Sequence, residues 1–444
     1  MAAIAEWLRE HAIEEIEAMV PDMAGTARGK FIPAGRYSEE DGIRLAEQLF
    51  SQTVTGDYVW ETSHVNPVDI DMRVMPDADT LRLVPWAPCP TAQIIHDCYY
   101  ANHSPVQIAP RHVLKRVINQ FRKRGWQPVI APEVEFYLIK PNTDADYPLE
   151  PPVGRSGRQQ PARRLLSIDA LNEFEDVIED IYDFSEAQAL DIETLIHEDG
   201  VAQIEVNFVH GDPLKLADQV FLFKRTAREA AYRHGMYATF MAKPHENQPG
   251  SAMHLHQSVL DRDTGRNLFA NNRGKPTKLF LQYIAGLQGY MPTAMPLLAP
   301  NVNSYRRIAR YDAAPINTHW GYDNRTVGLR VPLSAPEATR VENRIPGSDA
   351  NPYLAIAATL ASGYLGIIEK LAPEEPLKTD AYDLPYNLPR DLQTALRLFR
   401  ESKPLAKVLG ESFVELYSQV KELEYETFFH VISSLERQHL LLNV

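Results

Sequence analysis

Apolar and polar positions alternate along several short stretches of the chain, and this period of two predicts β-strands. In residues 131–138, read as APEVEFYL, Val134 and Phe136 fall on one face, whereas Glu133 and Glu135 share the other. The stretch GSAMHLHQSVL, residues 250–260, turns a polar set to one face, namely His254, His256 and Ser258. Two carboxylates side by side on a strand repel each other, so Glu133 and Glu135 predict a cation over them.

A longer period, close to 3.6 residues, predicts helices in other parts of the chain. The N-terminal stretch reads as an amphipathic helix whose apolar positions include Ile4, Leu8, Ile13 and Ile16. The uncharged run 353–368 is shorter than the ~20 residues that span a bilayer, so it predicts a buried central helix. Further helices are predicted at 39–51, at 110–124, at 169–184, from Asp212–Pro213 to Gly235, and in the tail from Asp391.

The arrangement of these elements predicts an α+β protein with a small N-terminal domain at 1–105 and a large domain at 106–444. Short strands with few helices dominate the first hundred residues, and they are expected at 23–31, 53–60 and 80–84. The stretch 141–164 is rich in Pro, Gly and Arg, which predicts a long surface loop of the kind that often acts as a lid or a partner-contact arm.

Charge and cysteine content narrow the class of protein. The formal net charge of −14 argues against nucleic acid and anionic membrane surfaces as partners. The two cysteines, Cys89 and Cys98, cannot form a disulfide framework, and the N-terminus lacks the basic and apolar segments of a signal peptide. These features favour a cytoplasmic protein.

Four predicted strands each turn an unusual polar set to one face. These sets are Glu133 with Glu135, Glu205 alone, His254 with His256 and Ser258, and Arg340 with Glu342 and Arg344. Each residue taken alone is more often structural than catalytic, and a solvated face would carry Lys, Thr and Ser instead. If the strands share one curved sheet, the concave face also gathers Glu198, and so many carboxylates with an imidazole suit two Mg²⁺ or Mn²⁺ ions.

The arginines around these acids add a second requirement. Guanidinium groups match phosphates or carboxylates in a bidentate geometry, and arginines beside divalent metals are the equipment of phosphoryl transfer. The sequence has no Walker A motif and no kinase-type glycine loop, so ATP would be held in another way.

At this point the motifs resemble the glutamine synthetase family, and specifically its members that γ-glutamylate amines. The resemblance covers essentially the whole chain. It rests on P-E-x-E-F at 132–136, H-E-x-G-x-x-Q-x-E at 197–205, G-S-A-M-H-x-H-x-S at 250–258, N-S-Y-x-R at 303–307, and R-x-E-x-R-x-P followed by A-N-P-Y at 340–353. It implies an N-terminal β-grasp domain, a catalytic domain with a curved antiparallel sheet, and a homododecamer of two stacked rings with active sites between neighbouring subunits.

The resemblance also implies a role for each matching residue. One metal ion would be held by Glu135, Glu198 and Glu205, and the other by Glu133, His254 and Glu342. L-glutamate would be held by Arg307, Arg344 and the backbone at Gly250, beside the ligands Glu135 and His254. ATP would meet Glu193, His256, Ser258, Arg325, Arg330 and Arg340. The implied reaction forms γ-glutamyl phosphate and then an amide, with Arg344, Arg325 and Glu342 as its catalytic residues.

Departures from the family pattern concern the nucleophile. Ala313 stands where glutamine synthetases carry an acid on a G-Y-E-A-P loop, and Asp312 is displaced by one position. The ammonium-binding D-G-S-S is replaced by residues 55–58, and Pro249 replaces a common Asn. Losing two acidic contacts favours a bulkier amine, either a polyamine such as putrescine or a monoamine, and both remain open.

Two alternatives remain beside an amine ligase. One is a true glutamine synthetase that uses ammonium at a relocated site, and the other is a catalytically silent homologue. The second is disfavoured because all six candidate metal ligands are present. Tyr382 and Tyr386 lie in a segment that resembles the family's adenylylation loop, although an ordinary Pro-kinked surface loop explains AYDLPYNLP better.

Overall fold

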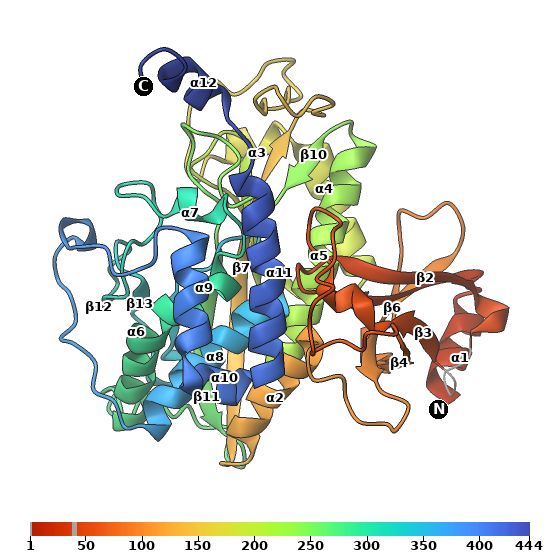
Figure 1. Ribbon diagram of the computed structural model, residues 1–444, viewed down its shortest axis with the longest axis horizontal. Coiled ribbons are helices and arrows are strands. Elements are labelled where there is room, and N and C mark those ends of the chain that lie inside the picture. Colours follow the sequence, from red (N-terminus) through yellow and green to blue (C-terminus); the bar gives the residue numbers. More distant parts are fainter. Residues whose placement is uncertain (1, 38–41) are drawn as a thin grey trace.

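The computed structural model describes residues 2–37 and 42–444, which form two β-sheets with helices packed around them (Figure 1). The N-terminal sheet has six strands in the order β2-β1-β6-β4-β3, with β5 beside β6. Its β1 and β6 strands are parallel, and its other pairs are antiparallel. The strands are β1 (Glu15–Pro21), β2 (Ala27–Pro33), β3 (Ile43–Ala46), β4 (Asp71–Pro76), β5 (Arg82–Leu83) and β6 (Thr91–Tyr99). This small sheet agrees with the expected β-grasp domain.

The sequence-based prediction was least accurate in this N-terminal part. Helix α1 (Ala2–Glu10) ends before Ala12, whose φ of 50° leaves the helical region, and Ile16 lies buried on β1 instead. The helix predicted at 39–51 is wrong where the chain is described: β3 pairs with β4 there, and a 3₁₀ helix at Glu47–Ser51 follows. Residues 39–41 lie outside the described residues.

Two further strand predictions fail in the same part: the strand expected at 53–60 is absent, and the one expected at 80–84 is shorter than predicted. The stretch 53–60 forms a turn in which the Thr53 amide donates to the Asp57 carbonyl at 2.9 Å, with a single bridge between Gln52 and Tyr58. The strand predicted at 80–84 is reduced to β5, preceded by a 3₁₀ helix at Ala78–Thr80. Gly56 and Asp57 form the turn in the first stretch, and Asp77 caps the 3₁₀ helix before the second, so local hydrogen bonds replace part of the ladder pairing.

The second sheet has eight strands in the order β12-β13-β14-β11-β7-β9-β8, with β10 beside β7. Its strands are β7 (Trp126–Ile139), β8 (Ile192–His197), β9 (Gln203–Phe208), β10 (Tyr237–Thr239), β11 (Met253–Asp261), β12 (Trp320–Tyr322), β13 (Leu329–Val331) and β14 (Val341–Asn343). The four strands that carry the unusual polar sets, β14, β11, β7 and β9, are therefore neighbours. This confirms that the polar sets belong to one sheet.

Helices cover the face of this sheet opposite the polar residues. Helix α8 (Pro352–Ile368) is buried along almost its whole length and packs against α6 (Lys278–Leu298), as its apolar sequence predicts. Helices α2 (Pro110–Arg122) and α5 (Pro213–Arg233) begin at the expected residues, and the Asp212 side chain caps α5. The predicted helix at 169–184 is divided into α3 (Ile168–Asn172) and α4 (Glu175–Ala187).

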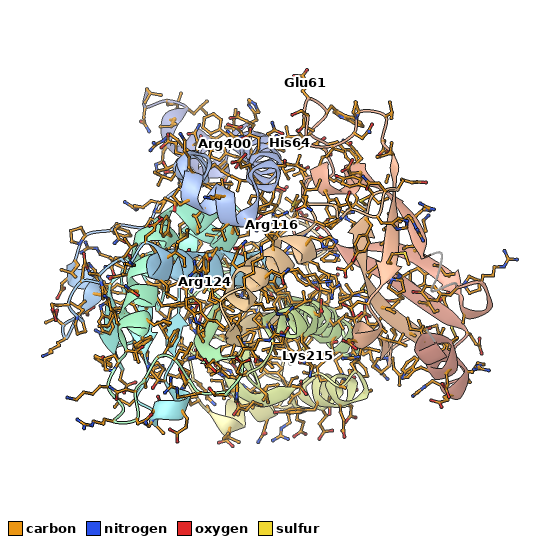
Figure 2. The ribbon with its side chains drawn as sticks, turned by 90° about the horizontal axis from the view of Figure 1, so that it is seen from below. Glu61, His64, Arg116, Arg124, Lys215 and Arg400 are labelled. Carbon is orange, nitrogen blue, oxygen red and sulfur yellow. The ribbon has the colours of Figure 1, made fainter. Side chains whose placement is uncertain are left out.

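The remaining helices are α7 (Ser304–Arg307) and four in the tail. The tail helices are α9 (Leu392–Glu401), α10 (Lys403–Leu409), α11 (Glu411–Phe429) and α12 (Ser434–Leu440). Arg116 of α2 donates to the Leu409 carbonyl at the end of α10, and the view from below shows it beside the tail helices (Figure 2). Within the described residues, no helix has the length and apolar character needed to cross a bilayer. The predicted loop at 141–164 contains neither helix nor strand.

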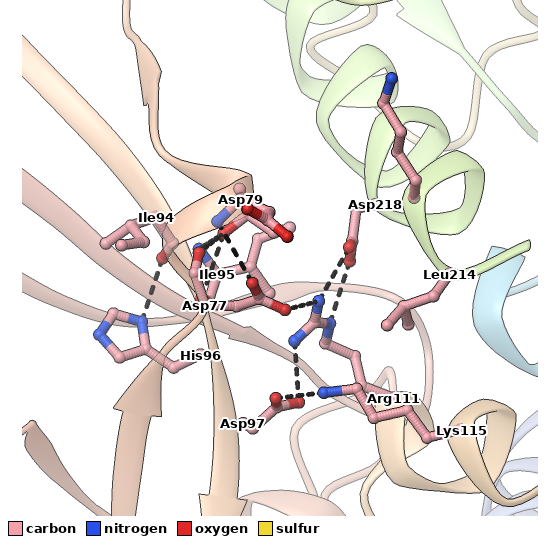
Figure 3. Close-up of polar contacts among 12 residues, drawn as sticks. Asp77, Asp79, Ile94, Ile95, His96, Asp97, Arg111, Lys115, Leu214 and Asp218 are labelled. Carbon is pink, nitrogen blue, oxygen red and sulfur yellow. Dashed lines mark hydrogen bonds and ion pairs between the residues drawn. The ribbon is translucent and has the colours of Figure 1, made fainter. Parts of the chain in front are cut away.

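A buried arginine joins the N-terminal sheet to the rest of the molecule. Arg111 at the start of α2 lies 2.8 Å from Asp97 of β6, 2.9 Å from Asp77 and 2.8 Å from Asp218 of α5 (Figure 3). Burial alone would raise the pKa of Asp97, but the charges of Arg111 and Lys115 hold it below its ordinary value. The two sheets are thus fixed to each other by one guanidinium with three carboxylates.

Candidate active site

The pairing register of the second sheet brings the predicted acids and imidazoles together. His254 of β11 lies opposite Glu133 of β7, and Glu135 of β7 lies opposite Glu205 of β9. On the other side of β11, His256 lies opposite Glu342 of β14. Residues directly opposite on one sheet face have Cβ atoms about 5 Å apart. The alternation read from the sequence therefore builds a continuous polar cluster across four strands.

Glu133 lies at the centre of this cluster. Its carboxylate oxygens are 3.2 Å from His254 Nδ1 and 2.8 Å from His256 Nε2. Candidate ligand atoms of Glu133, Glu205 and His254 all lie within 4.8 Å of one another, and the same holds for Glu133, His256 and Glu342. Glu133 belongs to both groups, and the division differs from the predicted one, because Glu205 lies with Glu133 and His254 while neither group includes Glu135 or Glu198.

The acids nearest β9 repel one another. Burial, with the charge of Glu198 added, raises the pKa of Glu135 to about 8. Burial and the charge of Glu133 raise the pKa of Glu205 to about 10, and burial also raises the pKa of Glu198. These carboxylates have too few cations of the protein around them, so a divalent ion with oxygen ligands fits the donor set. Glu135, Glu198 and Glu205 are the residues predicted to hold one ion.

The side of the cluster toward β14 has the opposite balance. Glu342 is almost fully buried, accepts from Arg330 Nη1 at 2.8 Å, and pairs closely with Arg344. Burial would raise the pKa of Glu342, but the surrounding groups, with the charge of Arg344 the largest of them, together outweigh burial and lower the pKa to about 2. Burial and Arg344 together lower the pKa of His254 to about 4, so this imidazole is neutral and can act as a metal ligand.

His256 connects the acids to Arg340. The Nε atom of Arg340 donates to His256 Nδ1 at 3.2 Å, which places the imidazole proton on Nε2 and directs it to Glu133. The resemblance assigns His256 to ATP, and its position beside Glu133 and Glu342 also allows it to meet a metal ion. Sequence reasoning did not separate these two roles.

Arg307 and Gly250 shape the region predicted for glutamate. Arg307 is buried, and its guanidinium donates to the carbonyl of Ile345 at 2.8 Å and to that of Arg344 at 3.0 Å. A Cβ atom on Gly250 would lie 2.6 Å from the Ala242 carbonyl and 2.6 Å from Arg307 Cγ, so only glycine fits there. Arg307 therefore fixes the backbone that carries Arg344.

Three predicted nucleotide contacts lie outside the acid cluster. Glu193 and Arg325 are exposed, and neither forms a hydrogen bond or ion pair within the described part of the chain. Arg325 borders a hollow of about 670 Å³ formed with the segment 376–380. Ser258 lies on β11, opposite Val129, on the same face as His256. Their roles at ATP stay predictions.

Gln203 is a site residue to which sequence reasoning assigned no role. It is almost completely buried, and its Nε2 donates to Glu135 at 3.2 Å and to the Gly250 carbonyl at 3.1 Å, while its Oε1 accepts from the Gly200 amide. It thereby ties the acid cluster to the Gly250 backbone. The sequence feature that could have identified it is the Q of the motif H-E-x-G-x-x-Q-x-E, which falls on the strand face opposite Ile204.

Comparison with known proteins agrees with this geometry. Residues 107–440 match the catalytic domain of glutamine synthetase. The chain belongs to the glutamine synthetase family. It is therefore an enzyme of a ligase family, and the motifs quoted above are family motifs.

Relatives within the family cover nearly all of the chain. It is 34% identical to γ-glutamylputrescine synthetase PuuA of Escherichia coli (strain K12), over 96% of this chain and 92% of that protein. It is also 34% identical to a glutamate–isopropylamine ligase of a Pseudomonas species, over 95% and 93%. A glutamine synthetase of Pyrococcus abyssi (strain GE5 / Orsay) is 32% identical, over 96% and 92%.

A solved structure titled GmaS without ligand has the same fold. It superposes with a TM-score of 0.86 at 28% identity and covers 100% of both chains. Its complex with ADP gives a TM-score of 0.85 at the same identity, over 99% of this chain and 100% of that chain. The expected fold class, with its curved sheet, is therefore confirmed.

Proposed function

We propose that this enzyme uses ATP to join the side-chain carboxylate of L-glutamate to an organic amine, through γ-glutamyl phosphate. The observation that carries the proposal is a complete acid, imidazole and guanidinium cluster combined with Ala313 in place of the acidic loop residue. The cluster has the groups needed for phosphoryl transfer. Selection of ammonium also needs closely placed carboxylates, and Ala313 removes one of them. The names of two relatives, a putrescine synthetase and an isopropylamine ligase, support an amine as the nucleophile.

The reaction proceeds in two steps. A glutamate side-chain oxygen attacks the γ-phosphorus of ATP, the bond to the bridging oxygen breaks, and ADP leaves. The uncharged amine nitrogen then attacks the acyl carbon, a proton leaves the nitrogen, and inorganic phosphate is released with the amide. Arg330, Arg340 and Arg344 line the cluster and offer guanidinium groups to the phosphoryl oxygens.

Two divalent ions, Mg²⁺ or Mn²⁺, would be held by Glu135, Glu198 and Glu205 and by Glu133, His254 and Glu342. Bound there, they supply positive charge to the phosphate oxygens. Arg307 and the Gly250 backbone orient the glutamate, with Glu135, His254 and Arg344 around it. Glu193, His256, Ser258, Arg325, Arg330 and Arg340 contact ATP, and Arg344, Arg325 and Glu342 act in catalysis.

The amine is either a polyamine or a monoamine. A diamine keeps a second ammonium group that needs an acidic or aromatic binding site, and a monoamine needs an apolar pocket.

We place the enzyme in cytoplasmic amine catabolism, where γ-glutamylation masks an amine. Its two cysteines are unpaired, which suits a reducing compartment. We further propose a homododecamer of two stacked rings.

A true glutamine synthetase is the second candidate, because archaeal glutamine synthetases match the chain over the same length at 30% to 32% identity. Phosphate release with ATP, Mg²⁺ and glutamate separates the two candidates when ammonium is compared with putrescine, spermidine and a series of monoamines. The proposal expects strong stimulation by an organic amine. Stimulation by ammonium alone would establish the second candidate, and no response to any amine would favour a silent homologue.

A further inference from the structure

The loop at residues 309–315, which we call the clasp loop, follows Arg307 and contains the position of the missing acid. Two of its non-glycine residues, Tyr311 and Ala313, have a φ of 59°. This left-handed conformation costs about 1–2 kcal/mol for a residue other than glycine, and it persists only where the surrounding structure enforces it. Contacts that hold the clasp loop on both of its sides are therefore expected.

On one side, Asp312 forms an ion pair with Lys243. The pair is largely shielded, because the exposed fractions are 9% for the Lys243 side chain and 21% for that of Asp312. Lys243 Nζ also donates to the Gln248 carbonyl at 2.7 Å, two residues before Gly250. Reciprocal bonds of 2.9 Å between Asn303 and the Lys243 backbone fix the lysine itself. Lys243 is thus a rigid anchor beside the region predicted for glutamate.

On the other side, the clasp loop packs on the segment 381–386. The Tyr311 ring packs on that of Tyr382 at a tilt of 54°, with centroids 5.3 Å apart, and the buried Tyr382 hydroxyl donates to the Ala314 carbonyl at 3.1 Å. The Arg310 amide donates to the Tyr386 hydroxyl at 3.2 Å. The hydroxyls of both tyrosines considered for adenylylation are therefore hydrogen-bonded to the backbone of the clasp loop.

The clasp loop lies beside the region predicted for glutamate: it begins two residues after Arg307, and Lys243 links its Asp312 to the Gln248 carbonyl. Tyr382, on which it packs, lies near the charges of Arg344 and Arg307, which oppose the rise that burial gives to its pKa. Asp312 is the one carboxylate in the loop sequence, and its partner is Lys243. The loop therefore borders the region predicted for glutamate with its one carboxylate already paired.

We propose that Lys243 and Asp312 are positioning residues whose ion pair holds the clasp loop in this place and keeps its only carboxylate away from the incoming amine. This inference rests on the proposed function and narrows its substrate class. An amine that meets Ala313 and the ring of Tyr311 gains affinity from its carbon chain, since the loop has no acid left to hold a small cation such as ammonium.

The first test measures the loop itself and needs no amine. Hydrogen–deuterium exchange is compared between the wild type, Asp312→Asn and Lys243→Met. We expect faster exchange at 309–315 in both variants and unchanged exchange in the core helix α8. Glu150→Gln is the matched control, because it removes an exposed ion pair of 2.7 Å with Lys140 at the end of β7. Unchanged exchange at 309–315 in both variants would overturn the proposal.

The second test uses kinetics. We expect KM for glutamate and for the amine to rise roughly fivefold in Asp312→Asn, with KM for ATP unchanged, as suits the loss of one shielded ion pair. The double variant should be no worse than the worse single variant, because the pair acts as a unit. Additive effects, or an equal rise of KM for ATP, would contradict a positioning role. A wild type that forms no amide with any amine would refute the proposed function but leave the exchange result valid.

Discussion

At the scale of single residues, Glu342 has the most demanding surroundings in the site. Its carboxylate is shared between Arg330 and Arg344 and lies 3.8 Å from His254. Replacing it removes a predicted metal ligand, takes away the carboxylate paired with Arg344, and leaves Arg330 with Asp323 alone. Glu342 therefore serves both the chemistry and the balance of charge in the sheet.

We predict that Glu342→Gln lowers turnover by about a thousandfold or more, the usual effect of losing a group that organises transition-state charge. Phosphate release with ATP, Mg²⁺, glutamate and an effective amine measures this, and circular dichroism checks the fold. Glu337→Gln is the control, because Glu337 is exposed and lies outside the acid cluster. Near-normal turnover in Glu342→Gln would mean that the polar face is not the active site.

His96 gives a prediction about pH. It is buried on β6, where Nδ1 donates to the Ile94 carbonyl (Figure 3). Its Nε2 pairs with the Tyr37 hydroxyl, and the folded protein holds the imidazole neutral. Burial lowers its pKa from 6.5 to about 4. Between these values the unfolded chain binds the proton and the folded chain does not, so stability falls as the pH falls from 6.5 toward 4.

This single group should cost about 3 kcal/mol of stability across that window. The measurement is the free energy of unfolding in urea at pH 7, 5.5 and 4.5, for the wild type and for His96→Asn. We expect the advantage of the wild type over His96→Asn to shrink as the pH falls. An advantage that is constant with pH would show that His96 is not held neutral.

Sequence reasoning at this scale succeeded where side chains share a strand face. Glu133, Glu205, His254 and Glu342 could be grouped because a period of two fixes their direction, whatever the order of the strands. It did not find Arg111 or Lys243, because each is surrounded by partners distant in sequence. Asp77, Asp97 and Asp218 surround Arg111 only after the fold has formed.

At the scale of elements, agreement with the sequence depends on how much of each element is buried. Helix α8 and strand β7 were predicted well because long apolar or alternating runs determine them. The sequence of 39–51 has a helical pattern, but its residues 43–46 pair with β4 instead, so tertiary contacts override the propensity there. Short elements near the protein surface contain too few apolar positions for their periodicity to distinguish a helix from a strand.

The junction of β6, α2 and α5 can be tested through Arg111. We predict that Arg111→Met destabilises the protein by about 3–5 kcal/mol, since it leaves carboxylates of three elements near one another without their shared cation. Urea unfolding measures the loss. Arg122→Met on the same helix is the control: its contact with Asp212 is 3.6 Å long and exposed, so about 0.5 kcal/mol is expected. A loss in Arg111→Met equal to the control would mean that the junction does not depend on this arginine.

At the scale of the whole molecule, the exposed apolar residues are concentrated at the end of the chain. Helix α12 has no buried residue, and Figure 1 shows it projecting beyond the end of α11. The exposed apolar side chains there are Phe428, Phe429, Val431, Ile432, Leu435, Leu440, Leu441, Leu442 and Val444. So many exposed apolar side chains in one terminal segment mark an interaction site, and a second copy of the chain would cover it in the proposed rings.

We therefore predict that the triple variant Val431→Ser, Ile432→Ser, Leu435→Ser assembles into smaller particles than the wild type. Removing apolar area from a subunit interface weakens association by about 25 cal/mol for each Å² of lost burial, repeated at every symmetric contact. Sedimentation velocity measures the particle size, and Asn443→Ser is the control because it leaves the apolar residues in place. Because α12 buries none of its residues within one subunit, the three substitutions should not lower the unfolding midpoint of the separated subunit. Equal particle size in wild type and triple variant would place the ring contacts elsewhere on the molecule.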